Sequence, residues 1–567
     1  MTKLTPKLIS EELLVKAYRS GTTILLAMNL DKMATDNLAG FSILCTPPNK
    51  PAYYLNNRLN FTSGVHRGTT VADREWTPSN LAPFQKFRWI HSLPEDQVEG
   101  IYSYTVTAMY FNPDNSLKEG PSTSVTIDLS RDKYTSFQDC SIGFTRGYLS
   151  SQAYAEKFKN AHYRPEVKSI DFDTTAYQDQ YKWLGGDARR LVFDFLEECL
   201  NDPCITVDLF AYDLDEPDFI RGLQKLGSRL RAVLDNSHLH KEPGSLEVIA
   251  AERLIQSAGE QNVVQGHFKR FAHNKVLIQK KDGKAIKVLT GSANFSLRGL
   301  YVQANNIIIF DHPEIASKYE EAFNTTFTDM QGFKDASIAS QWFDFTLKDA
   351  PPVSIAFSPH VSYHVSLDRV AESISKAENS ILFAVMELSG KGPVLSSLQN
   401  LVNSQGLYSY GITQHAEGLS LFKPGVKTGE FAPFSYLKET IPENFKEEWS
   451  GGMGQVIHNK FVVVDFNGKN PVVYTGSSNL AGGGEEENGD NLIAIYDRQI
   501  ATAYAVEAIR LVDHYHFRFS AKNHPSTKPL VLQGPEKKWW EPYYDENNPK
   551  FHDRETLTKD METLDLV

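Results

Sequence analysis

The sequence predicts an α/β protein made of two related lobes that form one site, preceded by an all-β sandwich. The tripeptide His273–Lys275 (His-Asn-Lys) recurs as His458–Lys460, and each copy precedes a Gly-Ser-x-Asn turn. The histidine-to-serine spacing is 19 residues in both copies (292 − 273 and 477 − 458). Strand and helix patterns alternate around both motifs, which is typical of sheets covered by helices. A repeated pattern of this kind predicts two lobes of one architecture.

Residues 1–130 read as an accessory domain rich in β structure. Ser103–Ala108 alternates small or polar residues with larger ones, as expected of a half-buried strand. The predicted strands are Thr22–Leu26, Phe41–Cys45, Phe87–Ile90, Ile101–Tyr110 and Ser124–Leu129. This pattern favours a β-sandwich similar to the immunoglobulin or fibronectin type III class. It contains no catalytic cluster, so we expect a structural role first and binding or targeting second.

The two lobes are expected at residues 135–350 and 351–520, with the same order of elements. In the first lobe we expect helices Ala188–Leu200, Pro217–Leu226 and Ile315–Phe323, with strands Cys204–Ala211, Val276–Gln279, Ile286–Leu289 and Asn306–Phe310. In the second we expect helices Leu367–Ala377, Pro393–Val402 and Ile500–Tyr515, with strands Ser380–Met386, Phe461–Val464, Pro471–Tyr474 and Leu492–Tyr496. Functional residues in such folds stand at strand ends and in loops.

Residues 521–567 form an aromatic-rich C-terminal extension. We expect Lys537–Tyr544, which contains two tryptophans and two tyrosines, to pack across the lobes. The acidic end, Asp560–Val567, is expected to be frayed.

Composition limits the classes of function. The chain has 567 residues and a net charge of −12, which argues against general electrostatic binding to nucleic acid. The four cysteines lack metal-ligand spacing, and no apolar signal core or membrane-length apolar stretch is found. We therefore expect a cytoplasmic protein with reduced thiols, although export without such a signal is compatible with the sequence.

The repeated motif predicts one active site built from two halves. A single His-x-Lys is usually a surface pair and a single Gly-Ser-x-Asn is usually a turn, but here both recur in order with equal spacing. Two histidines allow one to attack while the other donates a proton, and lysines and amides can hold an anionic group. The candidate catalytic residues are His273, Lys275, Asn294, His458, Lys460 and Asn479.

These residues resemble the signature of the phospholipase D superfamily, which is His-x-Lys, four residues, Asp, and later Gly-Ser-x-Asn. The second copy is complete and has Asp465 at the aspartate position, whereas the first copy has Lys280 there. The resemblance implies that this aspartate is a structural residue away from the phosphate. It covers residues 135–520 and leaves the sandwich unexplained.

The resemblance also implies a mechanism. His273 would attack a phosphodiester and form a covalent phosphohistidine, while His458 would act as acid and then base. Ser292 and Ser477 would bind phosphoryl oxygens, and neither a metal nor another cofactor would be required.

A candidate orienting residue follows the motif asparagine by eleven residues in each copy (305 − 294 and 490 − 479): Asn305 in the first and Asp490 in the second. We expect Asp490 beside His458, favouring its protonated form, and neutral Asn305 beside His273, leaving that imidazole a free base.

The substrate stays open at this stage. The preferred function is hydrolysis or transfer of phospholipid headgroups, which would involve contact with a membrane surface. Cleavage of nucleic acid is the second candidate function. A cleft lined by apolar loops would favour lipid, and a basic groove with aromatics would favour single-stranded nucleic acid. Transfer of the cardiolipin-synthase type is less favoured without a membrane segment. A non-catalytic binding protein is disfavoured because the catalytic set is intact, and one chain, as a monomer, suffices for a whole site.

Two kinds of feature carry less information. Specificity is expected in the loops Asn236–Gly266 and Gly406–Gly454, and Gly482–Gly484 is expected to be a flexible loop near the cleft because it lacks the residues of a nucleotide phosphate loop. The remaining histidines have no evident metal-ligand setting; they include His238, His240, His267, His514 and His516.

Overall fold

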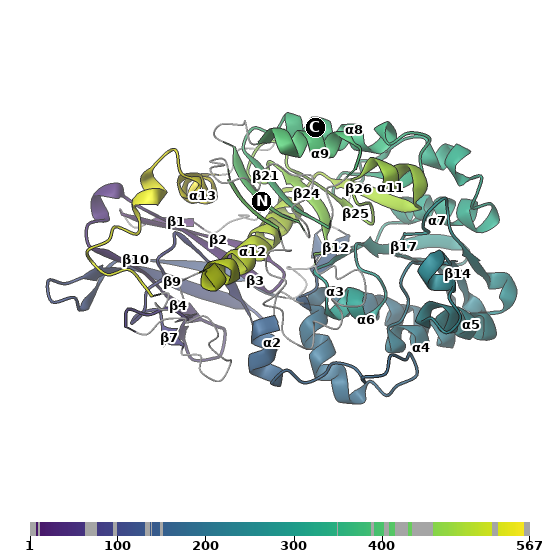
Figure 1. Cartoon of the computed structure of the whole chain (residues 1–567), viewed down its shortest axis with the longest axis horizontal. Helices are drawn as coiled ribbons and strands as arrows, with labels where there is room; N and C mark the ends of the chain where they lie inside the picture. The colour runs from purple at the N-terminus through teal and green to yellow at the C-terminus, as the bar shows by residue number, and fades with distance from the viewer. Residues whose placement is uncertain are drawn as a thin grey trace.

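The computed structural model places an N-terminal β-sandwich beside two α/β lobes (Figure 1). It describes residues 7–9, 12–62, 76–93, 99–130, 136–137, 139–147, 151–348, 350–386, 390–401, 407–413, 429–433, 457–523 and 531–560. Most of the predicted specificity loop Gly406–Gly454, and residues 561–567 of the expected frayed end, therefore lie outside the described residues. The predicted fold class is confirmed.

The sandwich consists of two antiparallel four-stranded sheets. One has the order β1-β2-β3-β8, formed by Lys7–Ile9, Leu13–Ser20, Thr23–Leu30 and Arg88–Ser92. The other has the order β10-β9-β4-β5, formed by Leu117–Asp128, Ile101–Phe111, Leu38–Thr46 and Tyr53–Tyr54. Alternate residues of β9 are buried, as the sequence pattern predicts, and the inner faces enclose a separate apolar core.

The first lobe is built on an eight-stranded mixed sheet. Its order is β11-β12-β18-β17-β16-β13-β14-β15, formed by Ser136–Phe137, Cys140–Phe144, Asn306–Phe310, Lys284–Gly291, Val276–Lys281, Ile205–Ala211, Leu230–Asp235 and Val263–Gly266. Only the pairs within β13-β14-β15 are parallel, and the other pairs are antiparallel. Apart from the edge strand β11, the buried β strands run through the centre of the lobe.

The second lobe repeats this topology. Its sheet has the order β19-β20-β26-β25-β24-β21-β22-β23, formed by Phe343–Phe345, Val353–Ser358, Asp490–Ile495, Val472–Gly476, Lys460–Val464, Ser380–Val385, Tyr408–Thr413 and Gly429–Pro433. The strands β16 and β24, which follow the two His-Asn-Lys segments, therefore occupy the same position in the two sheets. This equivalence gives the sequence repeat a structural basis.

The helices cover these sheets. In the first lobe they include α2 (Ser151–Phe158), α3 (Gln178–Asn201), α4 (Pro217–Leu226), α5 (Leu246–Ala258), α6 (Leu297–Tyr301) and α7 (Pro313–Thr328). The second lobe has α8 (His364–Ser375), α9 (Pro393–Asn400), α11 (Gly482–Glu487) and α12 (Arg498–Asn523). The expected flexible loop Gly482–Gly484 is thus the first half of a short helix. Its backbone is tied by bonds such as Glu485 N–H to the carbonyl of Ala481, at 3.1 Å.

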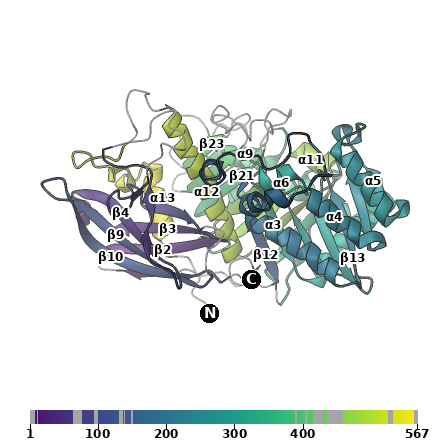
Figure 2. The same cartoon turned by 90° about the horizontal axis from the view of Figure 1, so that it is seen from below.

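The C-terminal aromatic segment packs on the sandwich, which corrects the prediction that it packs across the lobes. Trp539, Trp540 and Tyr543 belong to the sandwich core, and the indole N–H of Trp539 donates to the carbonyl of Leu38 at 2.8 Å. The Trp539 ring lies 5.7 Å from that of Phe87. The yellow segment containing α13 (Pro549–Thr558) lies against the purple strands in both views (Figures 1 and 2). The sandwich core is small, and these large rings extend it.

One link between the sandwich and the second lobe is a buried arginine. Arg88 on β8 donates to Asp513 of α12 at 2.6 Å, to Asp553 of α13, and to Tyr410 of β22 at 2.9 Å. Its side chain is 5% exposed, so each of these contacts is shielded from water. No helix among the described ranges is long and apolar enough to cross a bilayer.

Candidate active site

The two His-Asn-Lys segments meet where the lobes face each other. The first segment ends just before β16 and the second runs into β24, whose first residue is Lys460, and backbone hydrogen bonds connect the lobes beside both segments. His458 N–H donates to the carbonyl of Ala304 at 3.2 Å, and Gly489 N–H donates to the carbonyl of Phe271 at 2.8 Å. The lobes therefore join at the motif segments themselves.

The catalytic candidates are nearly all buried at this junction. His273 and His458 are 5% and 4% exposed, and Lys275 and Lys460 are fully buried. Lys275 influences the pKa of His458, and His273 does so as well, which places both halves within one electrostatic environment. The two predicted histidines and the two predicted lysines are thus brought together in one place.

Each histidine is held by a residue from the opposite lobe. Nδ1 of His273 lies 2.7 Å from Oδ1 of Asp490, and Nδ1 of His458 lies 2.8 Å from Oδ1 of Asn305. The contacts place Asn305 and Asp490 where an orienting residue would stand, but the predicted pairing is wrong, because each was assigned to the histidine of its own copy. The residue at the start of β18 or β26 faces across the interface, so it reaches the other lobe's motif.

These contacts define the tautomer of both imidazoles. A carboxylate only accepts, so His273 carries its proton on Nδ1. The amide nitrogen of Asn305 donates to the carbonyl of Gly299 at 2.8 Å, which leaves its oxygen to accept from His458. Nε2 of His458 lies 3.2 Å from Nζ of Lys460. The contact at Nδ1 leaves Nε2 of His273 for chemistry, whereas Nε2 of His458 is within hydrogen-bonding distance of the Lys460 ammonium group.

A second pair of contacts crosses the interface in the same way. Asn306 donates to Oδ1 of Asn459 at 3.1 Å, and Asn491 donates to Oδ1 of Asn274 at 2.8 Å. The middle residue of each His-Asn-Lys segment is therefore anchored by the other lobe. These residues were not predicted from the sequence, although Asn recurs at the same place in both copies.

The electrostatics of the site favour an anionic ligand. Burial, together with neighbouring cations, lowers the pKa of Lys460 well below its usual value, and burial lowers that of Lys275 to about 8. Burial and Lys275 lower the pKa of His273, and burial and Lys460 lower that of His458 well below its usual value. Positive charges that repel each other in a buried site are stabilised when a phosphate binds between them.

The two motif serines already have partners within the fold. The hydroxyl of Ser292 donates to Oδ1 of Asn305 at 2.9 Å and accepts from the N–H of Asn306 at 3.0 Å. The hydroxyl of Ser477 accepts from the N–H of Asn491 at 3.0 Å. These serines hold the turns and the orienting residue, and their direct contact with phosphate stays a prediction.

The two motif asparagines differ in their surroundings. The amide nitrogen of Asn294 donates to Oδ2 of Asp213 at 2.5 Å. The oxygens of Asn294 and Asn479 are buried and accept no hydrogen bond among the described residues. In the first lobe one amide end is therefore fixed by a carboxylate.

Asp465 and Lys280 occupy the same motif position but make different contacts. The carboxylate of Asp465 accepts from the backbone N–H groups of Glu378, Asn379 and Ser380, at 2.9, 2.7 and 2.8 Å. Nζ of Lys280 lies 2.8 Å from a carboxylate oxygen of Asp208 on β13. Both positions stabilise the sheet.

One cluster beside the site was not anticipated. Asp213, His240 and Glu247 offer ligand atoms within 4.8 Å of one another, which is a spacing that could hold a metal ion. However, Nδ1 of His240 lies 2.8 Å from Asp235 and Nε2 lies 3.1 Å from Asp213, and despite burial these carboxylates raise the pKa of His240 to about 10. Both nitrogens of His240 thus already face carboxylates within the fold.

Comparisons with known proteins agree with this geometry. A family model described as the cardiolipin synthase, phospholipase D-like domain matches residues 204–327 and 370–512. No curated protein gives a significant match.

Three solved structures illustrate the structural likeness. The first is Nuc, a phospholipase D family member from Salmonella typhimurium (22% identity, 25% of this chain and 87% of that chain, TM-score 0.20). The second is phosphatidylserine synthase from Haemophilus influenzae (13% identity, 66% of this chain and 94% of that chain, TM-score 0.38). The third is yeast tyrosyl-DNA phosphodiesterase (12% identity, 54% of this chain and 88% of that chain, TM-score 0.28).

The two segments matched by the family model contain both copies of the motif. Together with the repeated sheet, they make the chain similar to the phospholipase D-like domain that this model describes.

Proposed function

We propose that the chain is a metal-independent phosphodiesterase that works through a covalent phosphohistidine. The observation that carries this proposal is the crossed support of two imidazoles. Asp490 and Asn305 each hold a histidine by Nδ1, which leaves Nε2 for chemistry, and two buried lysines lie in the same site.

In the first step, Nε2 of His273 attacks phosphorus, and the bond from phosphorus to the leaving oxygen breaks. The imidazole becomes cationic as it attacks, and the carboxylate of Asp490 on its Nδ1–H stabilises that charge. Nε2 of His458 gives its proton to the leaving oxygen. The pKa of His458 is low in the free protein because of burial and Lys460, so the bound phosphate must raise it for this role.

In the second step, His458 takes a proton from water. The water oxygen bonds to phosphorus while the bond from phosphorus to His273 breaks, which restores the free imidazole. An alcohol in place of water would give transfer instead of hydrolysis. Throughout, Lys275 and Lys460 stabilise the negative phosphoryl oxygens.

The first candidate substrate is a phospholipid, from which the enzyme would release or exchange the headgroup. The description of the matching family model supports this choice. Both halves of the site belong to one chain, so a monomer is the proposed active unit. A lipid substrate would bring the cleft to a membrane surface.

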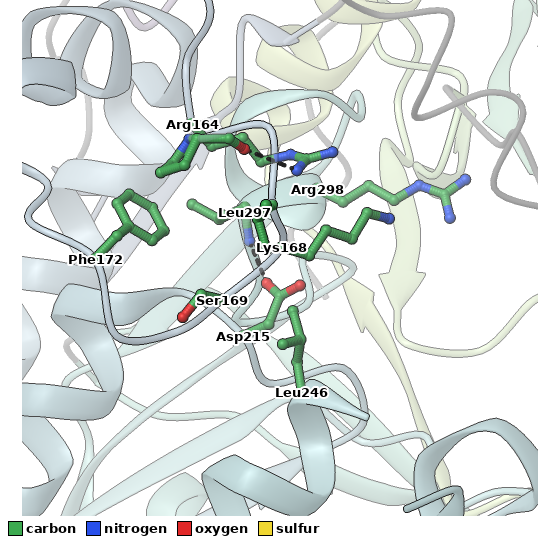
Figure 3. Close-up of a pocket in the computed structure, with 10 residues that line it drawn as sticks. Arg164, Lys168, Ser169, Phe172, Asp215, Leu246, Leu297 and Arg298 are labelled. Atoms are coloured by element: carbon green, nitrogen blue, oxygen red, sulfur yellow. Dashed lines mark hydrogen bonds between the residues drawn. The ribbon is translucent and has the colours of Figure 1, made fainter. Parts of the chain in front are cut away.

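A second candidate, a nucleic-acid strand, is favoured by a basic pocket on the first lobe (Figure 3). The pocket lining includes Arg164, Lys168, Arg298 and the ring of Phe172, with Asp215 as its acidic residue. In Figure 3 the side chains of Lys168 and Arg298 extend in the same direction. Arg298 also acts on the pKa of His458, so the pocket adjoins the reaction centre. Cations beside an aromatic ring suit a phosphate backbone with stacked bases.

A paired assay in EDTA tests both candidates. One arm uses mixed phospholipid vesicles, and the other uses single-stranded and double-stranded DNA and RNA. The wild type is compared with the double variant His273→Ala, His458→Ala and with His364→Ala, which changes an exposed histidine outside the motif. Headgroup release that only the double variant loses supports the lipid substrate, and strand cleavage with that pattern supports the nuclease. Equal activity in all three proteins, or activity that requires a metal, would overturn the mechanism.

A further inference from the structure

A chain of hydrogen bonds, buried at His240 and Asp235 and partly exposed at Asp213, connects two parts of the catalytic motif in the first lobe. It begins at Asn294, whose amide nitrogen donates to Oδ2 of Asp213 at 2.5 Å. The other oxygen of Asp213 lies 3.1 Å from Nε2 of His240. Nδ1 of His240 lies 2.8 Å from Oδ2 of Asp235. We name Asp213, His240 and Asp235 the carboxylate–histidine chain.

The far end of this chain reaches the nucleophile's segment. Oδ1 of Asp235 accepts from the backbone N–H of Ala272, the residue before His273, at 2.6 Å. Oδ2 of Asp235 also accepts from the N–H of Ser237 at 2.9 Å. The chain therefore holds both the amide of Asn294 and the backbone that leads into His273.

Asp213 decides which end of the Asn294 amide can face a substrate. A carboxylate has no hydrogen to donate, so the amide nitrogen, not the oxygen, must point to Asp213. The second hydrogen on that nitrogen then stays available for a phosphoryl oxygen. A reversed amide would present its oxygen to the anion and repel it.

The same carboxylate would oppose an anionic substrate if its charge were not balanced. His240, held between two carboxylates, is the cationic side chain that bonds to Asp213 directly, and Lys275 and Arg298 act on Asp213 without such a bond. The ring of Tyr212 lies 4.6 Å from that of His240 and 4.7 Å from that of His273, so this balance is set next to the reacting histidine.

We propose that Asp213 and His240 are positioning residues. Asp213 fixes the amide of Asn294 with an N–H toward the phosphoryl group, and His240 neutralises Asp213 so that the anion can approach. This inference rests on the proposed phosphodiesterase function. It assigns to His240 an electrostatic role that is distinct from packing.

The test is a double-mutant cycle with Asp213→Asn, His240→Gln and the combined variant, using bis(4-nitrophenyl) phosphate as a soluble phosphodiester. Removing the His240 charge leaves Asp213 unbalanced, so we expect KM to rise about tenfold and to fall again with added salt. Asp213→Asn lets the Asn294 amide reverse, so we expect kcat to fall about tenfold with KM little changed. In the combined variant the unbalanced carboxylate is gone, and KM should return to within about twofold of the wild type.

Recovery of KM by a second substitution is a result that a purely structural role does not give. Additive losses in the combined variant, or an unchanged KM in His240→Gln, would overturn the proposal. Binding of inorganic phosphate to the same four proteins, measured by calorimetry, should follow the same order as KM. Phosphate binding does not depend on turnover. If the wild type is inactive but the four proteins bind phosphate in the expected order, the proposed reaction is contradicted and the proposed role of the carboxylate–histidine chain is not.

Thermal melting of each variant provides the folding control. If His240→Gln does not fold, Asp213→Asn alone still tests the fixed amide, because it keeps the shape of the side chain. An unchanged kcat in that variant would also contradict the proposal.

Discussion

The two lobes share one strand order but support their histidines with different chemistry. The first lobe's His273 receives a carboxylate, Asp490, and the second lobe's His458 receives an amide, Asn305. Both supports come from the opposite lobe. The two partners differ by one side-chain atom, an amide nitrogen in place of a carboxylate oxygen, and in the proposed mechanism this difference gives two similar imidazoles unequal roles.

This difference bears directly on the order of events. A carboxylate stabilises an imidazole as it becomes cationic, which suits the residue that forms a bond to phosphorus. A neutral amide orients the ring without stabilising its charge to the same extent, so His458 can release its proton more readily. The observed pairing thus supports His273 as nucleophile by a different route from the sequence argument, which placed the neutral partner there.

The largest expected effect separates the two histidines. His273→Ala removes the nucleophile, so turnover should fall by about 10⁴-fold or to background. His458→Ala removes the acid and base, and should cost about 10²- to 10⁴-fold. Acid-quenched reactions with a labelled phosphoryl group should show protein-bound label in His458→Ala and none in His273→Ala. The opposite labelling pattern would exchange the two roles.

A smaller effect is expected when the supports are exchanged. Asp490→Asn removes the charge on the Nδ1 partner of His273 and permits the wrong tautomer, so kcat should fall by about 10²-fold. Asn305→Asp adds a charge beside His458 but loses the bond to the carbonyl of Gly299, so kcat should fall by less than about tenfold.

Only the ratio of the two losses of kcat is needed to compare these variants. Equal losses would mean that the supports differ in identity but not in function. Folding of each variant can be checked by circular dichroism before the kinetic constants are compared.

The pH dependence of kcat/KM tests whether the charge of Lys275 is needed. The pKa of Lys275 is lowered to about 8, so this lysine loses its positive charge as pH rises through that value. Since the proposed role of this cation is to bind the phosphate, kcat/KM, which reports the free enzyme, should fall up to tenfold per unit above about pH 8. A profile that stays flat from about pH 7 to about pH 10 would show that the charge of this lysine is not needed.

The sequence predicted the repeat, the order of strands around it and the membership of both motifs in one site. Those inferences depend on local patterns and on spacing along the chain, and neither depends on how the lobes are placed in the folded protein. The helix α4, for example, was predicted at Pro217–Leu226 and is observed there, because a proline start and an amphipathic pattern define it locally.

Contacts between the lobes could not be predicted in this way. The spacing of Asn305 and Asp490 was informative, but it did not reveal which histidine each would face, since that depends on how the lobes are placed. Asp213 and His240 were missed because they are 27 residues apart (240 − 213) and belong to no repeat. The aromatic C-terminus was assigned to the wrong surface because apolar composition does not identify a partner.

The smallest expected effects concern the motif position at which the lobes differ in charge. Asp465→Ala would leave three backbone N–H groups without their acceptor in a position that is 7% exposed, so the free energy of unfolding should fall by about 3 kcal/mol. Lys280→Ala should cost about 1 kcal/mol, because Asp208 keeps its two bonds to Arg231. Denaturant unfolding of the two variants measures both. In each case kcat should stay close to that of the wild type, because neither side chain touches the histidines. A large loss of kcat in Asp465→Ala without loss of stability would instead tie this aspartate to the chemistry, and the charge difference between the lobes would then be catalytic.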